Sequence, residues 1–171
     1  MGWGADYAFK SCPGGLPLTL DGQAAVPPSA PVLRTAPAAM LKRIHHAALI
    51  CSDYAASKRF YTECLGLRVV AENYRAARQS YKLDLALPDG SQLELFSFPG
   101  APARPSRPEA QGLRHLAFEV DDVARCKQAL EDQGVAVEDI RLDEYTGHRF
   151  VFFADPDGLP LELYEARAMA G

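Results

Sequence analysis

Two histidines and two glutamates recur in this 171-residue chain at nearly the same spacing. Glu94 follows His46 by 48 residues, and Glu162 follows His115 by 47. Two imidazoles and two carboxylates form a nitrogen and oxygen donor set that suits nickel, cobalt, zinc, iron or manganese. The two carboxylates also balance a divalent charge, and an octahedral ion would keep two positions open for water or substrate. The pattern predicts one divalent ion held by His46, Glu94, His115 and Glu162.

These four residues belong to two copies of one sequence module. In each copy the histidine is followed seven residues later by an aspartate, Asp53 or Asp122, and the glutamate lies in a D-G-x-x-L-E-L-aromatic string. An internal repeat determines the architecture of a chain. Taken singly, each of the four could be an ordinary strand side chain, but the repetition of both residue types at one spacing favours the metal site.

Each copy has the pattern of a βαβββ unit. Short runs rich in apolar and β-favouring residues predict strands, and apolar residues at helical spacing predict one helix after the first strand. The helices are expected to begin at Ser52 or Asp53 and at Asp121 or Asp122, and to end at Gly66 and Gly134. The predicted strands span residues 43–51, 67–74, 79–87 and 91–98 in the first copy, and 113–120, 135–142, 148–154 and 159–165 in the second.

The predicted fold class is α+β, with two tandem modules over residues 43–98 and 113–165 and a proline-rich connector over 99–112. Because residues alternate between the faces of a strand, His46 is expected to share a face with Ala48 and Ile50. Glu94, flanked by Leu93 and Leu95, is expected to point away from the leucine face. If each sheet curls, the two modules form a curled mixed sheet around the metal site. The modules can pair within one chain or exchange between two chains, and the connector permits either.

Residues outside the two modules differ in composition. The first 40 residues contain six prolines, five glycines and eight alanines, which predicts a flexible tail. Met40 precedes the first predicted strand directly, so it is a candidate for the biological start. Residues 166–171 form a short C-terminal tail.

Charge and hydropathy exclude several function classes. The net charge is −4 with no lysine-rich or arginine-rich run, so neither nucleic acid nor a membrane surface is an expected partner. No apolar stretch is long enough to span a bilayer, and no secretory signal is recognisable, so we expect a cytoplasmic protein. Four cysteines without a CxxC pair predict reduced thiols.

The segment 43–165 resembles the vicinal oxygen chelate superfamily, and within it proteins of the glyoxalase I type. The matching motifs are Phe60-Tyr61, Leu65-Gly66-Leu67, Leu93-Glu94-Leu95, His115-Leu116-Ala117-Phe118, and Asp155-Pro156-Asp157-Gly158 before Leu161-Glu162-Leu163. The glyoxalase, bleomycin resistance and dioxygenase proteins share this fold. The resemblance implies the same four metal ligands.

The resemblance also implies an activity. Glyoxalase I isomerises the hemithioacetal of methylglyoxal and glutathione to S-lactoylglutathione, and so is a lactoylglutathione lyase. Proton removal next to a carbonyl leaves an enediolate, whose two adjacent oxygens can chelate the ion. By resemblance Glu162 is the base, Glu94 is its partner, and the protein is a homodimer.

The substrate is less constrained than the metal. Glyoxalase I enzymes generally carry an arginine four residues after the first histidine ligand and an asparagine four residues after the first glutamate, both used on glutathione. This chain has Ile50 and Phe98 there, so the sequence does not predict glutathione. Arginine suits carboxylate or phosphate, and the candidate residues for an anionic small-molecule substrate are Arg75, Lys82, Arg107 and Arg149.

Two other functions fit the same scaffold. One is a dioxygenase or an epimerase acting on another small oxygenated substrate. The other is a metal-free protein that binds a small molecule and confers resistance to it. The second is disfavoured because such a protein needs no paired histidines and glutamates.

Overall fold

The computed structural model describes residues 41–105, 108 and 110–166, and it confirms two βαβββ modules. The predicted tail over residues 1–40, Met40 included, lies outside the described residues, as do Arg107 and residues 167–171. The elements of module 1 are β1 (His46–Ile50), α1 (Tyr54–Arg59), η1 (Phe60–Cys64), β2 (Arg68–Arg75), η2 (Ala76–Arg78), β3 (Ser80–Ala86) and β4 (Gln92–Phe96).

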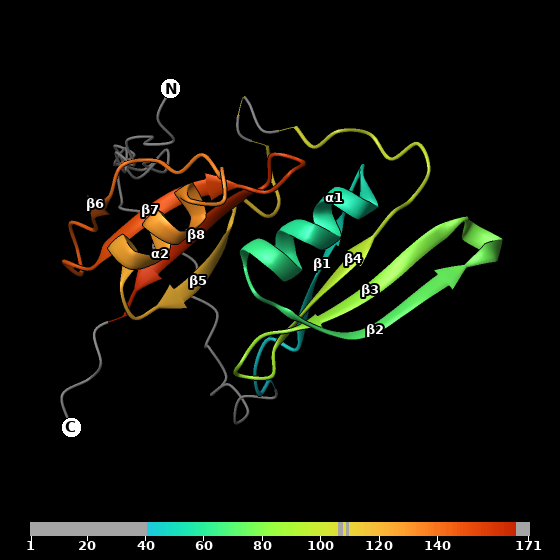
Figure 1. Cartoon of the computed structure of the whole chain (residues 1–171), viewed down its shortest axis with the longest axis horizontal. Helices are drawn as coiled ribbons and strands as arrows, with labels where there is room; N and C mark the ends of the chain where they lie inside the picture. The colour runs from blue at the N-terminus through green and yellow to red at the C-terminus, as the bar shows by residue number, and fades with distance from the viewer. Residues whose placement is uncertain (1–40, 106–107, 109, 167–171) are drawn as a thin grey trace, which may run out of the picture. The chain divides into compact units, whose positions relative to one another are not determined.

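Module 2 repeats this order of one α-helix and four strands, with a longer α-helix and a much shorter second strand. Its elements are β5 (Leu116–Val120), α2 (Val123–Glu131), β6 (Arg141–Leu142), β7 (Arg149–Ala154) and β8 (Pro160–Glu165). The sheet orders are β1-β4-β3-β2 and β5-β8-β7-β6. In each sheet the first and last strands of the module pair in parallel and the other pairs are antiparallel. Each helix lies against the sheet of its own module (Figure 1).

Two predicted elements differ from the structure. The strand predicted over 135–142 is reduced to Arg141–Leu142 and an isolated bridge between Val137 and Phe153, because acidic residues, which disfavour strands, stand between these points. The helix predicted up to Gly66 is α-helical only to Arg59 and then π-helical. There the Thr62 hydroxyl donates a hydrogen bond at 2.7 Å to the backbone carbonyl of Lys58, a group that otherwise accepts from the helix backbone.

The helix ends follow the sequence signals. Asp53 accepts a hydrogen bond from the Ala56 N–H at 3.0 Å, and Asp122 accepts one from the Arg125 N–H at 3.1 Å. Gly66 has a φ of 70°, a backbone conformation that costs other residues steric strain. These local contacts determine where each helix begins after the first strand of its module, and where the helical segment of module 1 ends.

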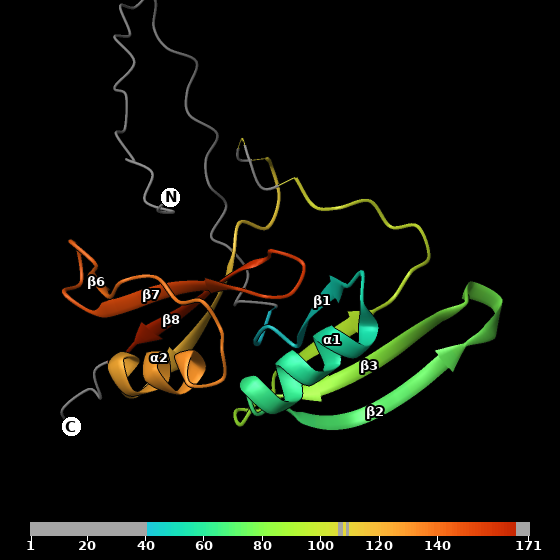
Figure 2. The same ribbon diagram turned by 45° about the horizontal axis from the view of Figure 1, so that its top comes forward.

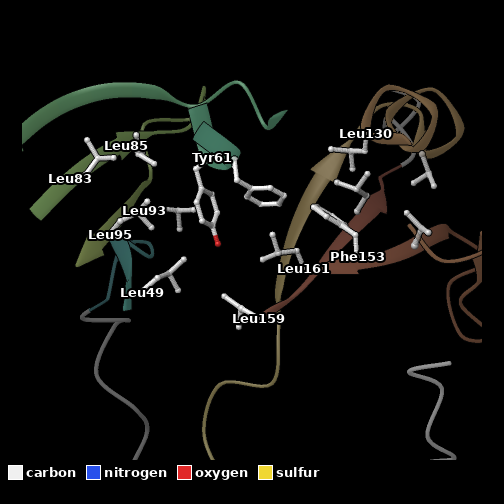
Figure 3. Close-up of a cluster of buried hydrophobic side chains, with 14 residues drawn as sticks. Leu49, Tyr61, Leu83, Leu85, Leu93, Leu95, Leu130, Phe153, Leu159 and Leu161 are labelled. Atoms are coloured by element: carbon white, nitrogen blue, oxygen red, sulfur yellow. The ribbon is translucent and has the colours of Figure 1, made fainter. Parts of the chain in front are cut away.

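Leucine side chains on one face of each sheet form the core with Tyr61 (Figure 3). Tyr61 is fully buried, and its hydroxyl donates to Asp155 Oδ2 at 2.9 Å. Burial and the Asp155 carboxylate both raise the pKa of Tyr61, so the phenol stays protonated. Asp155 Oδ1 accepts from the N–H groups of Asp157 and Leu159, at 3.0 and 2.8 Å. Tyr61 of module 1 therefore holds the turn before β8 of module 2.

Replacing Tyr61 by Phe is expected to destabilise the protein by about 1–3 kcal/mol, because one acceptor site of a partly buried carboxylate is left unpaired. Urea unfolding measures the change. The matched control is Tyr54→Phe, which removes a hydroxyl bonded at 2.6 Å to the exposed Glu72. It should cost about 0.5 kcal/mol or less. Equal losses in the two variants would contradict the role given to Tyr61.

The β2–β3 hairpin extends beyond the other two strands of its sheet in both views (Figures 1 and 2). At its tip the chain passes through η2, and Gln79 adopts a φ of 48° in the left-handed region. This hairpin positions three cationic side chains discussed below. Among the residues that the structure describes, no helix is long and apolar enough to cross a membrane.

Candidate metal centre

Module 1 presents one His–Glu pair on the face of its sheet opposite the leucines. In β1, Leu49 is buried while His46 is exposed. Glu94 of β4 is in register with Ala48, two residues after His46, so the two side chains share a face. His46 Nε2 lies 3.9 Å from Glu94 Oε2, and the Nδ1 atoms of His45 and His46 lie 3.0 Å apart. The Nε2 atom of His46 is therefore the one directed toward the carboxylate.

Module 2 repeats this pair in the same register. Glu162 of β8 is opposite Ala117 of β5, two residues after His115. His115 Nε2 lies 3.0 Å from Glu162 Oε2, and the imidazole meets the Phe152 ring edge to face at 5.2 Å between centroids. The buried His115 Nδ1 has no partner in the structure. Equal spacing in sequence thus gives equal placement on the two sheets.

Each His–Glu pair has two of the donor atoms that the predicted metal ion needs, and each pair is called a half-site here. Two ligand atoms bound at about 2.1 Å and right angles to each other are about 3 Å apart, close to the His115–Glu162 separation of 3.0 Å. Within the described ranges, however, no three His, Cys, Asp or Glu side chains are grouped so that they could hold an ion. The four-ligand site therefore stays a prediction.

Lys82 lies beside the module 1 pair. Its ammonium donates to Glu94 Oε1 at 2.9 Å and also bonds Asp84. The side chains of Lys82 and Glu94 are 20% and 16% exposed, so this ion pair is partly shielded from water. Lys82 neutralises the carboxylate that is predicted to bind a metal, and one oxygen of Glu94 remains on the His46 side.

The electrostatics differ around Glu162. Burial raises the pKa of the Glu162 carboxyl, while His115 and Arg141 act in the opposite direction. Arg141 bonds Glu138 at 3.0 Å, and its guanidinium lies 4.9 and 5.2 Å from the ring centroids of Phe150 and Phe152. Arg141 is not among the residues predicted for the site, because a single arginine in a predicted strand cannot be distinguished from an ordinary surface charge.

The other candidate substrate residues lie in different places. The Arg75 guanidinium is 5.4 Å from the ring centroid of Phe96. Phe96 is on the same strand as Glu94 and on the same face of the sheet. Arg149 is placed elsewhere: it alternates with Phe150, bonds Glu165 at 2.6 Å and lies 3.8 Å from Asp122 at the start of α2. Its guanidinium is thus engaged at a helix end and away from the Glu162 face. Arg107 lies outside the described residues.

A cavity of about 730 Å³ lies next to β1. Its walls are the end of β1, the start of the connector and the turn before β8, and none of the four candidate metal ligands lines it. Most of its lining is apolar, with carboxylates from Asp155 and Asp157. Both carboxylates accept backbone hydrogen bonds, so they stabilise the fold here.

Comparisons with known proteins agree with the fold and the repeated motifs. The sequence profile of the Glyoxalase/Bleomycin resistance protein/Dioxygenase superfamily matches residues 43–163. The uncharacterized protein YaeR of Escherichia coli is 59% identical over 125 residues, which cover 73% of this chain and 97% of YaeR. A 2-epi-5-epi-valiolone epimerase of an Actinomyces species is 31% identical, with coverage of 74% and 81%.

One solved structure is similar over the same region. A glyoxalase family protein from Enterococcus faecalis has 50% sequence identity and a TM-score of 0.69, and the match covers 72% of this chain and 98% of that one. The matched profile spans both modules and the connector, so the resemblance seen in the sequence is confirmed. The chain belongs to the Glyoxalase/Bleomycin resistance protein/Dioxygenase superfamily, the vicinal oxygen chelate proteins.

Proposed function

We propose that this protein is a metal-dependent lyase or isomerase of the glyoxalase I type, which moves a proton between two carbons next to a carbonyl. The observation that carries the proposal is the duplicated His–Glu pair, placed in the same register on each sheet. Each pair supplies one imidazole nitrogen and one carboxylate oxygen, and together they match a divalent ion such as nickel, cobalt or zinc, with manganese or iron as alternatives.

His46, Glu94, His115 and Glu162 would hold the divalent ion, which would supply electrostatic stabilisation for the negative charge that develops when a proton is removed next to a carbonyl. The side chains of this chain do the rest. Glu162 removes the proton from one carbon and returns it to the neighbouring carbon, and burial, which raises the pKa of its carboxyl, favours this role as a base. Glu94 is its partner, and Lys82 holds Glu94 by one oxygen. His46 and His115 present Nε2 to the site.

The two half-sites are proposed to meet between two chains of a homodimer. Within one chain the described residues supply pairs and no larger group. Strand β1, which contains His46, and strand β5, which begins directly after His115, are edge strands of their sheets. Apolar side chains beside them are exposed, among them Ile50 and Leu113, each 56% exposed. A second copy packed on these edges covers this surface and joins module 1 of one chain to module 2 of the other.

The test is elemental analysis of untagged protein purified without chelator and then loaded with nickel, cobalt, manganese or zinc. About one tightly bound ion per chain is expected, with loss of the ion in His46→Ala and in Glu94→Ala. The control is His148→Ala, a histidine outside the four. An absence of stoichiometric metal under every condition would overturn the proposal and favour a metal-free binding protein.

Epimerisation is the second candidate, because one relative of 31% identity is an epimerase. Both reactions begin with the same proton abstraction, so the four proposed ligands serve either one. The outcome differs: an isomerase moves oxidation state between neighbouring carbons, whereas an epimerase inverts one carbon. Proton NMR of products formed in D2O separates them, and oxygen consumption with a catechol tests the dioxygenase alternative.

A further inference from the structure

A group of cationic and phenyl side chains extends from Glu94 along module 1. It consists of Arg75, Arg78, Lys82, Phe96 and Phe98, here called the Arg–Phe cluster. The rings of Phe96 and Phe98 are stacked with centroids 5.5 Å apart and planes 8° apart. Each ring lies beside a guanidinium, Arg75 at 5.4 Å from Phe96 and Arg78 at 6.0 Å from Phe98. The Lys82 ammonium is 5.9 Å from Phe96.

The local backbone brings these side chains together. Phe96 is opposite Lys82 in the β3–β4 register. Arg75 ends β2 and Arg78 ends the η2 turn, three residues later, and the left-handed Gln79 returns the chain into β3. Ser80, in register with Arg75, is fully buried and its hydroxyl has no partner in the structure. The hairpin tip is thus shaped to place two guanidinium groups over two stacked rings.

Among the described residues, the two arginines differ from the other cations near the site because they form no ion pair. Lys82 is paired with Asp84 and Glu94, Arg141 with Glu138, and Arg149 with Glu165. Across the described part of the chain, Arg75 and Arg78 contact phenyl rings and form no ion pair or donated hydrogen bond, and both are exposed. A guanidinium that rests on a ring face is held in orientation while its N–H groups stay free for an oxyanion.

We propose that the Arg–Phe cluster binds the oxyanion group, a carboxylate or a phosphate, of the substrate whose reacting carbons lie at His46 and Glu94. This inference rests on the proposed function for the identity of the ligand as a substrate. Glu94 is two residues before Phe96 on β4, about 7 Å along the strand. The substrate class is therefore a small oxygenated compound with its anionic group several bonds from the carbonyl.

Binding is measured on full-length protein without added metal, so that a metal ion cannot bind the phosphate or acetate used as the probe. Inorganic phosphate and acetate are titrated separately at constant ionic strength while NMR follows the arginine Nε–H signals, and glycerol serves as the uncharged probe. We expect saturable shifts with one or both anions and none with glycerol. Whichever of phosphate and acetate binds tighter identifies the oxyanion.

Two double variants are compared. One combines Arg75→Gln with Arg78→Gln, and the other combines Arg75→Lys with Arg78→Lys. Loss of two charge-assisted contacts is expected to weaken anion binding by about tenfold to hundredfold, and the lysine pair by less, because lysine keeps the charge but not the fork. The control is Arg68→Gln, at the other end of β2. Both arginines are exposed, so unchanged thermal unfolding is expected.

An absence of saturable binding, or equal binding by wild type and the glutamine pair, would overturn the inference. An equal loss in Arg68→Gln would also overturn it, because the effect would then be one of overall charge. The experiment contains no metal and no turnover, so its failure is distinct from failure of the proposed function. If metal binding fails while anion binding depends on Arg75 and Arg78, the cluster stands as a ligand site of a binding protein.

Discussion

Glu162→Gln is expected to abolish proton transfer while the protein keeps much of its metal. The amide retains an oxygen that can ligate but cannot accept the proton, so the loss in rate is about 10²–10⁴-fold. The measurement is incorporation of solvent deuterium next to the carbonyl, followed by proton NMR. This readout is shared by lyase and epimerase chemistry, so it does not require a prior choice between them.

The comparison variants separate the two roles of the site. His115→Ala removes the nitrogen of a proposed ligand and should lower both metal content and turnover. Glu144→Gln removes a carboxylate in an exposed turn of the same module and should change neither. Unchanged exchange in Glu162→Gln would remove Glu162 from the role of base and direct attention to Glu94.

Two inactive variants are expected to restore part of the metal site when they are produced together. One chain carries His46→Ala with Glu94→Ala, and the other carries His115→Ala with Glu162→Ala. If each site combines module 1 of one chain with module 2 of its partner, half of the dimers are mixed and each has one intact site. About a quarter of the wild-type metal content is then expected.

Each variant purified alone is the control and should hold no stoichiometric ion. If the modules instead meet within a chain, every chain lacks half of its ligands and the mixture holds no ion either. A metal content near zero in a mixture proven to contain mixed dimers would contradict the shared site. Size measurement and differential tags establish that the mixed dimers exist.

Much of the fold is a local consequence of sequence. Asp53 and Asp122 cap their helices because a short acceptor side chain reaches the N–H groups of the first turn. The D-G turns and the leucine alternation fix the last hairpin of each module and the face that carries glutamate. Where local signals competed, the prediction was wrong, as at residues 135–142, of which only Arg141–Leu142 forms a strand.

The placement of charged side chains depended on partners distant in sequence. Arg75 and Arg149 looked equivalent as candidate anion ligands. The β7–β8 hairpin sets Arg149 beside Glu165, with which it forms an ion pair. The β2–β3 hairpin instead carries Arg75 to the ring of Phe96, where it forms no ion pair with any residue that the structure describes. Arg141 was missed for the same reason, since its position beside Phe150 and near Glu162 arises only when β6 pairs with β7.

The two modules, the chemical types of the four proposed ligands and the sheet face on which each lies could be predicted from the residues alone. These follow from alternation along strands and from the repeat, which are properties of short segments. The folded chain was needed to show that each histidine lies 3.9 or 3.0 Å from the glutamate of its own module, and that the described residues form no larger group. The reason is that the distance between two sheets depends on packing between whole surfaces, which no local pattern encodes.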